Sequence, residues 1–235
     1  MRTLGIIGGL GPMASTYFSE LLISLADVAR DQDHLDTIMV NRPSTPDRTA
    51  YILGKSSENP VPVIIGAGKT LKAAGVEAIA IPCVTSHYFY DQICEGIGLP
   101  VISMLECVAD RLKSSGINRA GIMATTGTVT TGLFQKALAR RGIECVVPSE
   151  KSQQRVMYVI YDCIKAGKPA DMPAFFSVCE ELFEAGAGSV ILGCTELSVA
   201  NKSIGLGGRY TDSLEELARS CLIRFGIKTK NRAFD

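Results

Sequence analysis

The stretches A-I-A-I-P-C-V-T-S-H (78–87) and S-V-I-L-G-C-T-E-L (189–197) decide the fold, because each joins an apolar strand-type run to a helix-prone segment through a cysteine. A buried parallel strand delivers its last residue to the carboxyl edge of the sheet, where α/β proteins bind ligands. Cys83 and Cys194 are therefore expected at such edges, beside the first N–H groups of the next helix. That helix dipole favours a thiolate, which serves as a base or nucleophile at neutral pH. Two such thiols facing one pocket indicate proton transfer on both faces of a carbon atom.

Outward from these motifs, apolar runs of strand length alternate with amphipathic stretches of helix length. The runs expected as strands are T-L-G-I-I (3–7), T-I-M-V-N (37–41), E-A-I-A-I-P (77–82), R-A-G-I-M-A (119–124), E-C-V-V (144–147) and S-V-I-L-G (189–193). Pro12 is expected to open one helix, Gly75 and Gly116 to end two, and Asp212 to cap the last. The alternation predicts right-handed βαβ units with parallel strands, and the fold class is therefore α/β.

An internal repeat divides the chain. Strand, turn and helix around Leu4–Gly11 recur around Ala120–Gly127, and the distance from turn to cysteine is roughly 75 residues in both halves. The repeat predicts two similar lobes, each a parallel sheet flanked by helices, related by a pseudo-two-fold axis with the site between them. The expected lobes are residues 1–99 and 100–211, with the last helix (212–235) returning to the first lobe.

Composition narrows the functional classes. The 235 residues include 24 Lys and Arg against 24 Asp and Glu, and this balance, without a basic block, argues against a nucleic-acid partner. No apolar stretch is long enough to span a bilayer, and the apolar run near the N-terminus predicts a strand rather than a signal peptide. Eight cysteines without a C-x-x-C motif favour reduced thiols in the cytoplasm over disulfides or structural zinc. Six of them lie in apolar patterns typical of a core: Cys94, Cys107, Cys145, Cys163, Cys179 and Cys221.

The turn G-G-L-G-P-M-A (8–14) contains the G-x-G-x-x-A pattern of dinucleotide-binding folds. However, the second strand ends in Asn41 and Arg42 rather than in an acid that holds a ribose, and Pro12 removes an N–H from the turn. We therefore favour a turn whose backbone approaches a small anionic ligand. A tight turn without a ligand role is the alternative.

For three further residues, the sequence leaves two possible roles open. His87, one helical turn beyond Cys83, either tunes the thiol or caps an apolar face. A zinc site formed by Cys83, His87 and Cys194 is poorly supported by the ligand spacing. Arg48 follows the second strand and Lys165 ends a helix. Both are either surface residues, with Lys165 a partner of the helix dipole, or cations that reach a substrate carboxylate.

The motifs together resemble the aspartate/glutamate racemase superfamily, and specifically its aspartate racemase branch. The resemblance runs through G-G-L-G-P (8–12), R-P-S-T-P-D-R-T (42–49), P-C-V-T-S-H (82–87), A-T-T-G-T (124–128), I-K-A-G (164–167) and G-C-T-E-L (193–197). Glutamate racemases of the family carry D-S-G after the first strand, where this chain has Gly8-Gly9-Leu10. The resemblance implies two α/β lobes in a homodimer, with the site between the lobes and with neither pyridoxal phosphate nor a metal.

The same resemblance implies roles for single residues. Cys83 and Cys194 would be the catalytic acid/base pair, and Arg48 and Lys165 would hold the side-chain carboxylate of the substrate. Members often carry asparagine after the first cysteine, where this chain has Val84, and that amide helps to hold the amino-acid end of the substrate. The expected substrate-binding residues are Gly9, Leu10, Gly11, Met13, Arg48, Val84, Thr85, Thr126, Lys165, Thr195 and Glu196.

The expected function is cofactor-independent racemisation of aspartate, with glutamate next. One cysteine takes the Cα proton as thiolate while the other supplies a proton to the opposite face, and Glu196 is placed to steer the proton of Cys194. N–H groups near Gly9–Gly11, Thr85, Thr126–Gly127 and Thr195 are expected to neutralise the α-carboxylate. The alternatives are maleate isomerisation, hydantoin racemisation or malonate decarboxylation on the same fold, a non-catalytic module that binds acidic amino acids, and a nucleotide-dependent enzyme.

Overall fold

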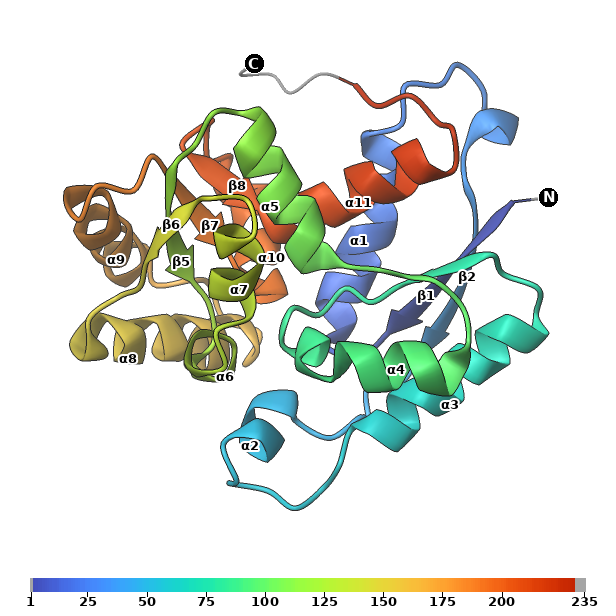
Figure 1. Cartoon of the computed structure of the whole chain (residues 1–235), viewed down its shortest axis with the longest axis horizontal. Coiled ribbons are helices and arrows are strands. Elements are labelled where there is room, and N and C mark those ends of the chain that lie inside the picture. Colours follow the sequence, from blue (N-terminus) through green and yellow to red (C-terminus); the bar gives the residue numbers. More distant parts are fainter. Residues whose placement is uncertain (1, 231–235) are drawn as a thin grey trace.

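The computed structural model describes residues 2–230 and contains two four-stranded parallel sheets flanked by helices (Figure 1). The first sheet has the order β2-β1-β3-β4 and the second the order β6-β5-β7-β8. Their strands are β1 (Thr3–Gly8), β2 (Asp36–Asn41), β3 (Ala78–Ala80), β4 (Val101–Ile102), β5 (Arg119–Met123), β6 (Glu144–Val146), β7 (Ser189–Leu192) and β8 (Tyr210–Asp212). The predicted α/β class is confirmed.

The two sheets repeat one topology. Each of β5 to β8 occupies the position in its sheet that the strand four places earlier occupies in the other, so the repeat predicted from the sequence is confirmed. All six expected strands are present. The strands β4, of two residues, and β8, of three residues, were not predicted.

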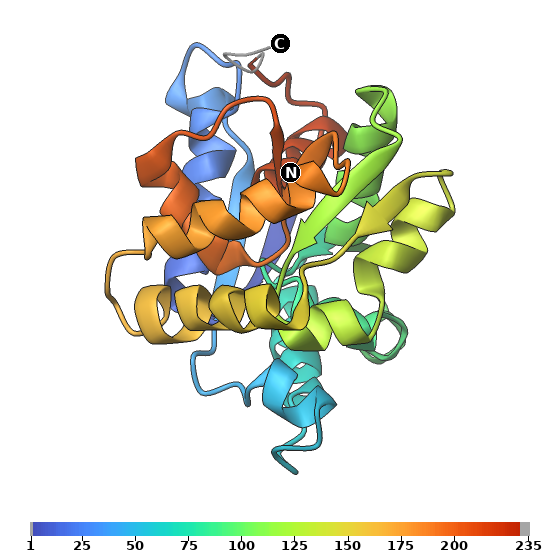
Figure 2. The ribbon, with the colours of Figure 1, turned by 90° about the vertical axis from the view of Figure 1, so that its left-hand side faces the viewer.

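Helices cover both faces of each sheet. The first sheet has α1 (Pro12–Ser24), α2 (Arg48–Ile52), α3 (Val61–Ala73) and α4 (Tyr90–Ile97) on its side of the molecule, with short 3₁₀ helices η1 (Asp31–Asp33) and η2 (Thr85–Phe89). The second has α6 (Thr126–Thr130), α7 (Leu133–Ala139), α8 (Glu150–Tyr158), the π-helix η3 (Val159–Ile164), α9 (Met172–Glu184) and α10 (Thr195–Ile204). Figure 2 shows α8 and α9 in front of the second sheet, and both pack on one apolar cluster with β5 and β7.

The expected helix signals are present. Pro12 opens α1, and Gly75 and Gly116 follow the ends of α3 and α5 (Met104–Ser114) with φ values of +84° and +71°. The Asp212 carboxylate accepts two backbone N–H groups at the start of α11 (Ser213–Arg224). Helix α11 packs against α1 and α5. Of the segment expected to return to the first lobe, residues 231–235 lie outside the described residues.

One apolar cluster joins the two sheets. It contains Ile6 of β1, Phe18 of α1, Ile122 of β5, Phe134 of α7 and Leu217 of α11, all fully buried. The first sheet includes β4, which lies beyond the expected boundary at residues 99 and 100. The division into lobes therefore stays a prediction, and strand pairing moves the end of the first sheet to Ile102.

The cysteines expected in the core divide into two groups. Cys163, Cys179 and Cys221 are buried, as predicted, whereas Cys94, Cys107 and Cys145 are half-buried and lie at the margins of the clusters. Within residues 2–230, no helix has both the length and the apolar character that a membrane crossing needs.

Candidate active site

Cys83 and Cys194 line one small cavity. Cys83 follows β3 and Cys194 follows β7, which are equivalent strands of the two sheets. The two cysteines are 5% and 6% exposed. The symmetry of the fold thus brings two thiols to the same small cavity from opposite sheets.

The expected site residues divide among two adjoining hollows. The cysteine cavity is lined by Leu10, Arg48, Cys83, Val84, Thr85, Lys165, Cys194, Thr195 and Glu196. Gly9, Gly11 and Met13 line an outer hollow that shares Arg48, Lys165 and Glu196 with it. Thr126 lines neither of these hollows. Its backbone N–H contacts the Met157 sulfur at 3.2 Å, and its neighbour Thr125 lines the cavity instead.

Sequence reasoning missed four residues of the cavity, which are Asp47, Thr49, Thr125 and Tyr161. Asp47 and Thr49 flank Arg48, and Tyr161 precedes Lys165 by about one helical turn, so both pairs could have been found from spacing. The Tyr161 hydroxyl donates to the Asp47 carboxylate at 3.1 Å. Burial is the main cause that raises the pKa of Tyr161 to about 12, so this hydroxyl keeps its proton.

Backbone carbonyls hold the Arg48 guanidinium in place. Asp47 caps α2, which begins at Arg48, and the guanidinium donates to the carbonyls of Leu10 at 2.6 Å, Pro46 at 2.9 Å and Thr45 at 3.3 Å. Arg48 is only 9% exposed, and its Nε has no hydrogen-bond partner among the described residues. A buried cation with a spare N–H donor is suited to bind an anion.

The charge of Arg48 is maintained by its neighbours. Burial alone would lower the pKa of Arg48, but Cys83, Asp47 and Glu196 outweigh burial and raise the pKa above its ordinary value. Cys83 therefore lies beside a permanent cation.

The glycine turn after β1 lies against Arg48 and lines both hollows. Gly9 has φ +97°, and a Cβ atom there would lie 2.4 Å from the backbone carbon of Arg42, so only glycine allows the two segments to meet. The Gly9 N–H donates to the Ser15 hydroxyl at 2.9 Å. This N–H was expected to neutralise a substrate carboxylate, and in the structure a side chain of α1 already accepts it. The turn instead presents the Leu10 carbonyl to Arg48.

Lys165, Glu196 and Cys194 form a connected chain of contacts. Lys165 follows η3, and its Nζ forms an ion pair with Glu196 Oε1. The second carboxylate oxygen, Oε2, accepts from the Cys194 thiol at 2.9 Å and from the Thr195 hydroxyl at 3.4 Å. Burial lowers the pKa of Lys165, but Glu196, Cys194 and Cys83 together raise it well above its ordinary value. Lys165 is therefore fully charged at neutral pH.

Cys194 does not behave as the helix-dipole argument predicted. It caps the N-terminus of α10 without a side-chain capping bond. Burial, followed by the negative charge of Glu196, raises the pKa of Cys194 well above its ordinary value, although Lys165 acts in the opposite direction. The expectation of a thiolate at this position is wrong, because desolvation and a facing carboxylate outweigh the dipole. Cys194 keeps its proton and donates it to Glu196.

His87 supports the backbone on either side of it. Its Nε2 accepts from the Met104 N–H at 3.1 Å, so Nδ1 carries the proton and donates to the Cys83 carbonyl at 3.0 Å. Burial lowers the pKa of His87, which keeps the ring neutral. Both nitrogens are thus used by the main chain, and His87 neither reaches the thiol nor serves as a zinc ligand. The described part of the chain contains no group of three His, Cys, Asp or Glu side chains arranged to hold a metal.

Four hydroxyl groups join the two lobes at the base of the cavity. Thr85, Thr125 and Thr128 are mutually 3.1 Å apart, and Thr49 reaches Thr125 at 3.4 Å. Val84, only 2% exposed, precedes Thr85 and lines the cavity, so the wall of the cavity is apolar at that point.

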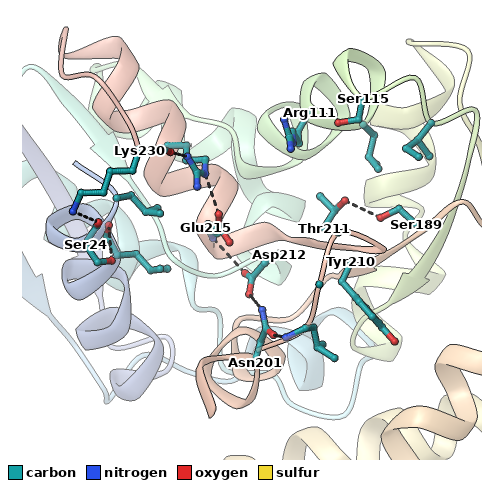
Figure 3. Close-up of a pocket in the computed structure, with 18 residues that line it drawn as sticks. Ser24, Arg111, Ser115, Ser189, Asn201, Tyr210, Thr211, Asp212, Glu215 and Lys230 are labelled. Carbon is teal, nitrogen blue, oxygen red and sulfur yellow. Dashed lines mark hydrogen bonds and ion pairs between the residues drawn. The ribbon is translucent and has the colours of Figure 1, made fainter. Parts of the chain in front are cut away.

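A larger hollow lies away from the cysteines (Figure 3). Its polar side chains bond to one another and to backbone: Ser189 contacts Thr211 at 2.9 Å, Asn201 donates to Asp212 at 3.0 Å, and Lys230 donates to the Ser24 carbonyl at 3.0 Å. These contacts connect β8 with β7 and α10, and Lys230 with the end of α1. The hollow is therefore part of the framework, and the cysteine cavity is the candidate active site.

The fold and this cavity define a two-lobed α/β protein with a symmetric pair of buried cysteines. Residues 7–221 match the family model described as Asp/Glu/Hydantoin racemase, and the chain belongs to that family. Its homologues are amino-acid racemases, so the resemblance predicted from the motifs is confirmed.

Individual relatives cover nearly the whole chain. A curated broad specificity amino-acid racemase, RacX of Bacillus subtilis, is 26% identical over 92% of this chain and 95% of its own length. The aspartate racemase of Picrophilus torridus superposes with a TM-score of 0.83 at 28% identity, covering 98% of this chain and 96% of its own. An aspartate racemase homologue from Pyrococcus horikoshii gives 0.76 at 25% identity, over 96% and 99% of the two chains. A Francisella tularensis glutamate racemase, at 0.67 and 17% identity over 100% and 86% of the two chains, shares the fold.

Proposed function

We propose that the protein racemises aspartate, with glutamate as its next substrate, by proton transfer between two cysteines. The observation that carries the proposal is the shared cavity of Cys83 and Cys194 with two cations, Arg48 and Lys165, on its wall. Two cations favour a substrate with two carboxylates. The similarity to an aspartate racemase over most of the chain supports the same assignment.

Each thiol acts on one face of the substrate carbon. For one enantiomer, Cys83 as thiolate takes the Cα proton, the electron pair stays on the carbon, and the Cys194 thiol gives its proton to the opposite face. The other enantiomer reverses the roles. The ligand-free structure suits the first direction, because Cys83 lies beside the cation of Arg48, whereas the Cys194 thiol donates its proton to the Glu196 carboxylate. The cationic wall and the hydroxyl groups of Thr85 and Thr195 stabilise the developing charge without rearrangement.

The proposed reaction uses neither pyridoxal phosphate nor a metal, because the two thiols supply the proton transfer. By family resemblance the enzyme is a cytoplasmic homodimer without nucleic-acid or membrane partners. Light scattering coupled to gel filtration tests the dimer by its mass.

A second candidate is a racemase with a wider range of amino acids. Val84 replaces the amide common in the family, and RacX is named a broad specificity enzyme. Relative rates for acidic and neutral amino acids in one assay separate the two candidates.

The test is incubation of the reduced protein with L- and D-aspartate in D₂O, followed by chiral analysis and NMR at Cα. Inversion with deuterium incorporation is expected for both enantiomers, and the same assay with glutamate sets the order of preference. Binding of aspartate without exchange at Cα would refute the racemase and support a binding module. Exchange without inversion would indicate a single working thiol.

A further inference from the structure

An apolar groove adjoins the outer hollow of the candidate active site. It lies between the start of α1, the end of η3, the start of α9 and helix α10, and its main apolar side chains are those of Met13, Ile164, Met172, Val199 and Ile204. Three of these, Met13, Ile164 and Val199, also line the outer hollow. Met13 is 68% exposed, and exposed apolar surface that gathers beside a site is typical of a place where a ligand binds.

The Lys165–Glu196 ion pair lies between the cysteine cavity and the outer hollow, since both residues line both spaces. The pair lies against Gly11 of the glycine turn, two residues before Met13. The three spaces therefore adjoin in the order cavity, outer hollow, groove. A ligand in the cavity that extends past the ion pair enters the outer hollow and then reaches the groove.

The ion pair offers both a donor and an acceptor to such a ligand. The Lys165 ammonium has three N–H donors, and the contact with Glu196 Oε1 uses one of them. The Glu196 carboxylate has about four lone-pair sites, and Lys165, Cys194 and Thr195 use three of them. A secondary amide matches this pair, because its carbonyl accepts from Lys165 while its N–H donates to Glu196.

The charges of the cysteine cavity agree with such a ligand. Its wall holds two carboxylates, Asp47 and Glu196, against its two cations, Arg48 and Lys165. An amino acid without net charge is therefore matched by this wall as well. An amide at the end of the side chain gives an acidic amino acid this charge.

We propose that the protein also racemises side-chain amides of aspartate whose nitrogen carries an apolar group, and that the groove binds this group. The inference rests on the proposed function and on Lys165 as the residue that binds the side-chain end of the substrate. The amide bond stays intact, and the proton steps at Cα are those of aspartate racemisation. The groove is assigned to the substrate because it continues from the site at the side-chain end.

Asparagine with and without a butyl group on its side-chain nitrogen tests the groove. The rate of deuterium exchange at Cα in D₂O gives kcat/KM for each compound. The wild-type value is expected to be at least about tenfold higher for N-butylasparagine than for asparagine, because each CH₂ group removed from water contributes roughly fourfold. This ratio of the two kcat/KM values measures what the groove contributes.

Two variants show whether the gain comes from the groove. Ala200→Gln places a polar side chain in it from α10, and the ratio is expected to fall to about one. Met172→Gln, which keeps the length of the side chain, gives the same result if the first variant folds poorly. Ala73→Gln, at the exposed end of α3, is the matched control and keeps the wild-type ratio.

The inference is overturned if the wild-type ratio is close to one, or if both groove variants keep the gain. A lower molecular mass of Ala200→Gln in light scattering would show that a second copy of the chain covers the groove, and it also overturns the inference. Aspartate in the same series tests the proposed function separately. Turnover of N-butylasparagine without turnover of aspartate supports the inference and refutes the aspartate assignment, whereas turnover of neither overturns both.

Discussion

At the scale of single residues, the two cysteines have matching positions and unlike neighbours. Cys83 faces Arg48, and Cys194 faces Glu196. Two thiols that are equivalent in the fold therefore have different charged neighbours, and in the proposed reaction each serves as the base in one direction and as the acid in the other.

Replacing either thiol tests the two-base scheme. Cys83→Ser and Cys194→Ser are each expected to lower two-way racemisation by roughly 10²- to 10⁴-fold, the usual contribution of a general acid or base. Folding is expected to change little, as circular dichroism and thermal unfolding will show. Cys145→Ser, at the half-buried cysteine of β6, is the control and retains activity. Full activity in either single variant contradicts the scheme.

Gly11 leaves room for the ion pair. A Cβ atom at this position would lie 3.1 Å from Glu196 Oε1 and 4.0 Å from Lys165 Nζ, and the backbone there is extended, so alanine is accepted without backbone strain. Gly11→Ala is expected to displace the pair and lower kcat/KM for aspartate by roughly ten- to a hundredfold, the cost of small misplacements in active sites.

Gly66→Ala is the matched control for this substitution. Gly66 lies inside α3, and a Cβ atom there would meet nothing within 4 Å. Its activity should equal that of the wild type, and its free energy of unfolding should rise by up to ~1 kcal/mol from helix propensity. If Gly11→Ala and Gly66→Ala have equal activities, the Lys165–Glu196 ion pair tolerates the displacement, and the prediction for Gly11 is contradicted.

At the scale of elements, the π-helix η3 sets the direction of Lys165. The Lys165 N–H donates to the Ile160 carbonyl at 2.9 Å, five residues back, so this turn contains one residue more than an α-helical turn. Such turns often occur at functional sites. Tyr161 and Lys165, which are four residues apart across this turn, line the same cavity.

Deleting Asp162, an exposed residue of this turn, tests the role of η3. The deletion places Lys165 three residues after Tyr161 in an α-helical turn, so the lysine changes its direction around the helix axis relative to Tyr161. KM for aspartate is expected to rise by about tenfold or more, which the loss of one charged hydrogen bond produces. Asp162→Ala keeps the chain length and is expected to keep the wild-type KM. Steady-state kinetics of both variants check the prediction, and equal KM values would contradict it.

At the scale of the whole molecule, the apolar cluster that spans both sheets stabilises the fold that holds the site. Cys221 of α11 is fully buried in this cluster. Burial, followed by the neighbouring Cys107, raises the pKa of Cys221 well above its ordinary value, although Arg224 acts in the opposite direction. Folding therefore depends on this thiol keeping its proton.

Alkaline pH is consequently expected to destabilise the protein. Below about pH 8.5, the ordinary pKa of a cysteine, folded and unfolded chains both hold the proton. Above it, the unfolded chain releases a proton that the folded chain retains, so the free energy of unfolding falls as pH rises. Urea unfolding at several pH values should show this fall, and Cys221→Ala should make it shallower. An unchanged slope in the variant would contradict the role of Cys221.

Sequence patterns predicted the parts of this molecule that depend on local periodicity. The six predicted strands, the repeat and the positions of Cys83 and Cys194 follow from apolar runs and spacing. Contacts between distant segments were not predictable in this way. The Gly9 N–H is taken by Ser15, Thr125 rather than Thr126 lines the cavity, and the thiol of Cys194 is governed by a carboxylate and by burial rather than by its helix.

The unequal surroundings of the two cysteines have a thermodynamic consequence for the proposed reaction. L- and D-aspartate have equal free energies in water, so the Haldane relation requires one value of kcat/KM for both directions. Arg48 and Glu196 therefore cannot give the enzyme a higher kcat/KM for one enantiomer than for the other. The effect of the two different neighbours is confined to compensating differences in kcat and KM. The enantiomer with the higher kcat must therefore also have the higher KM.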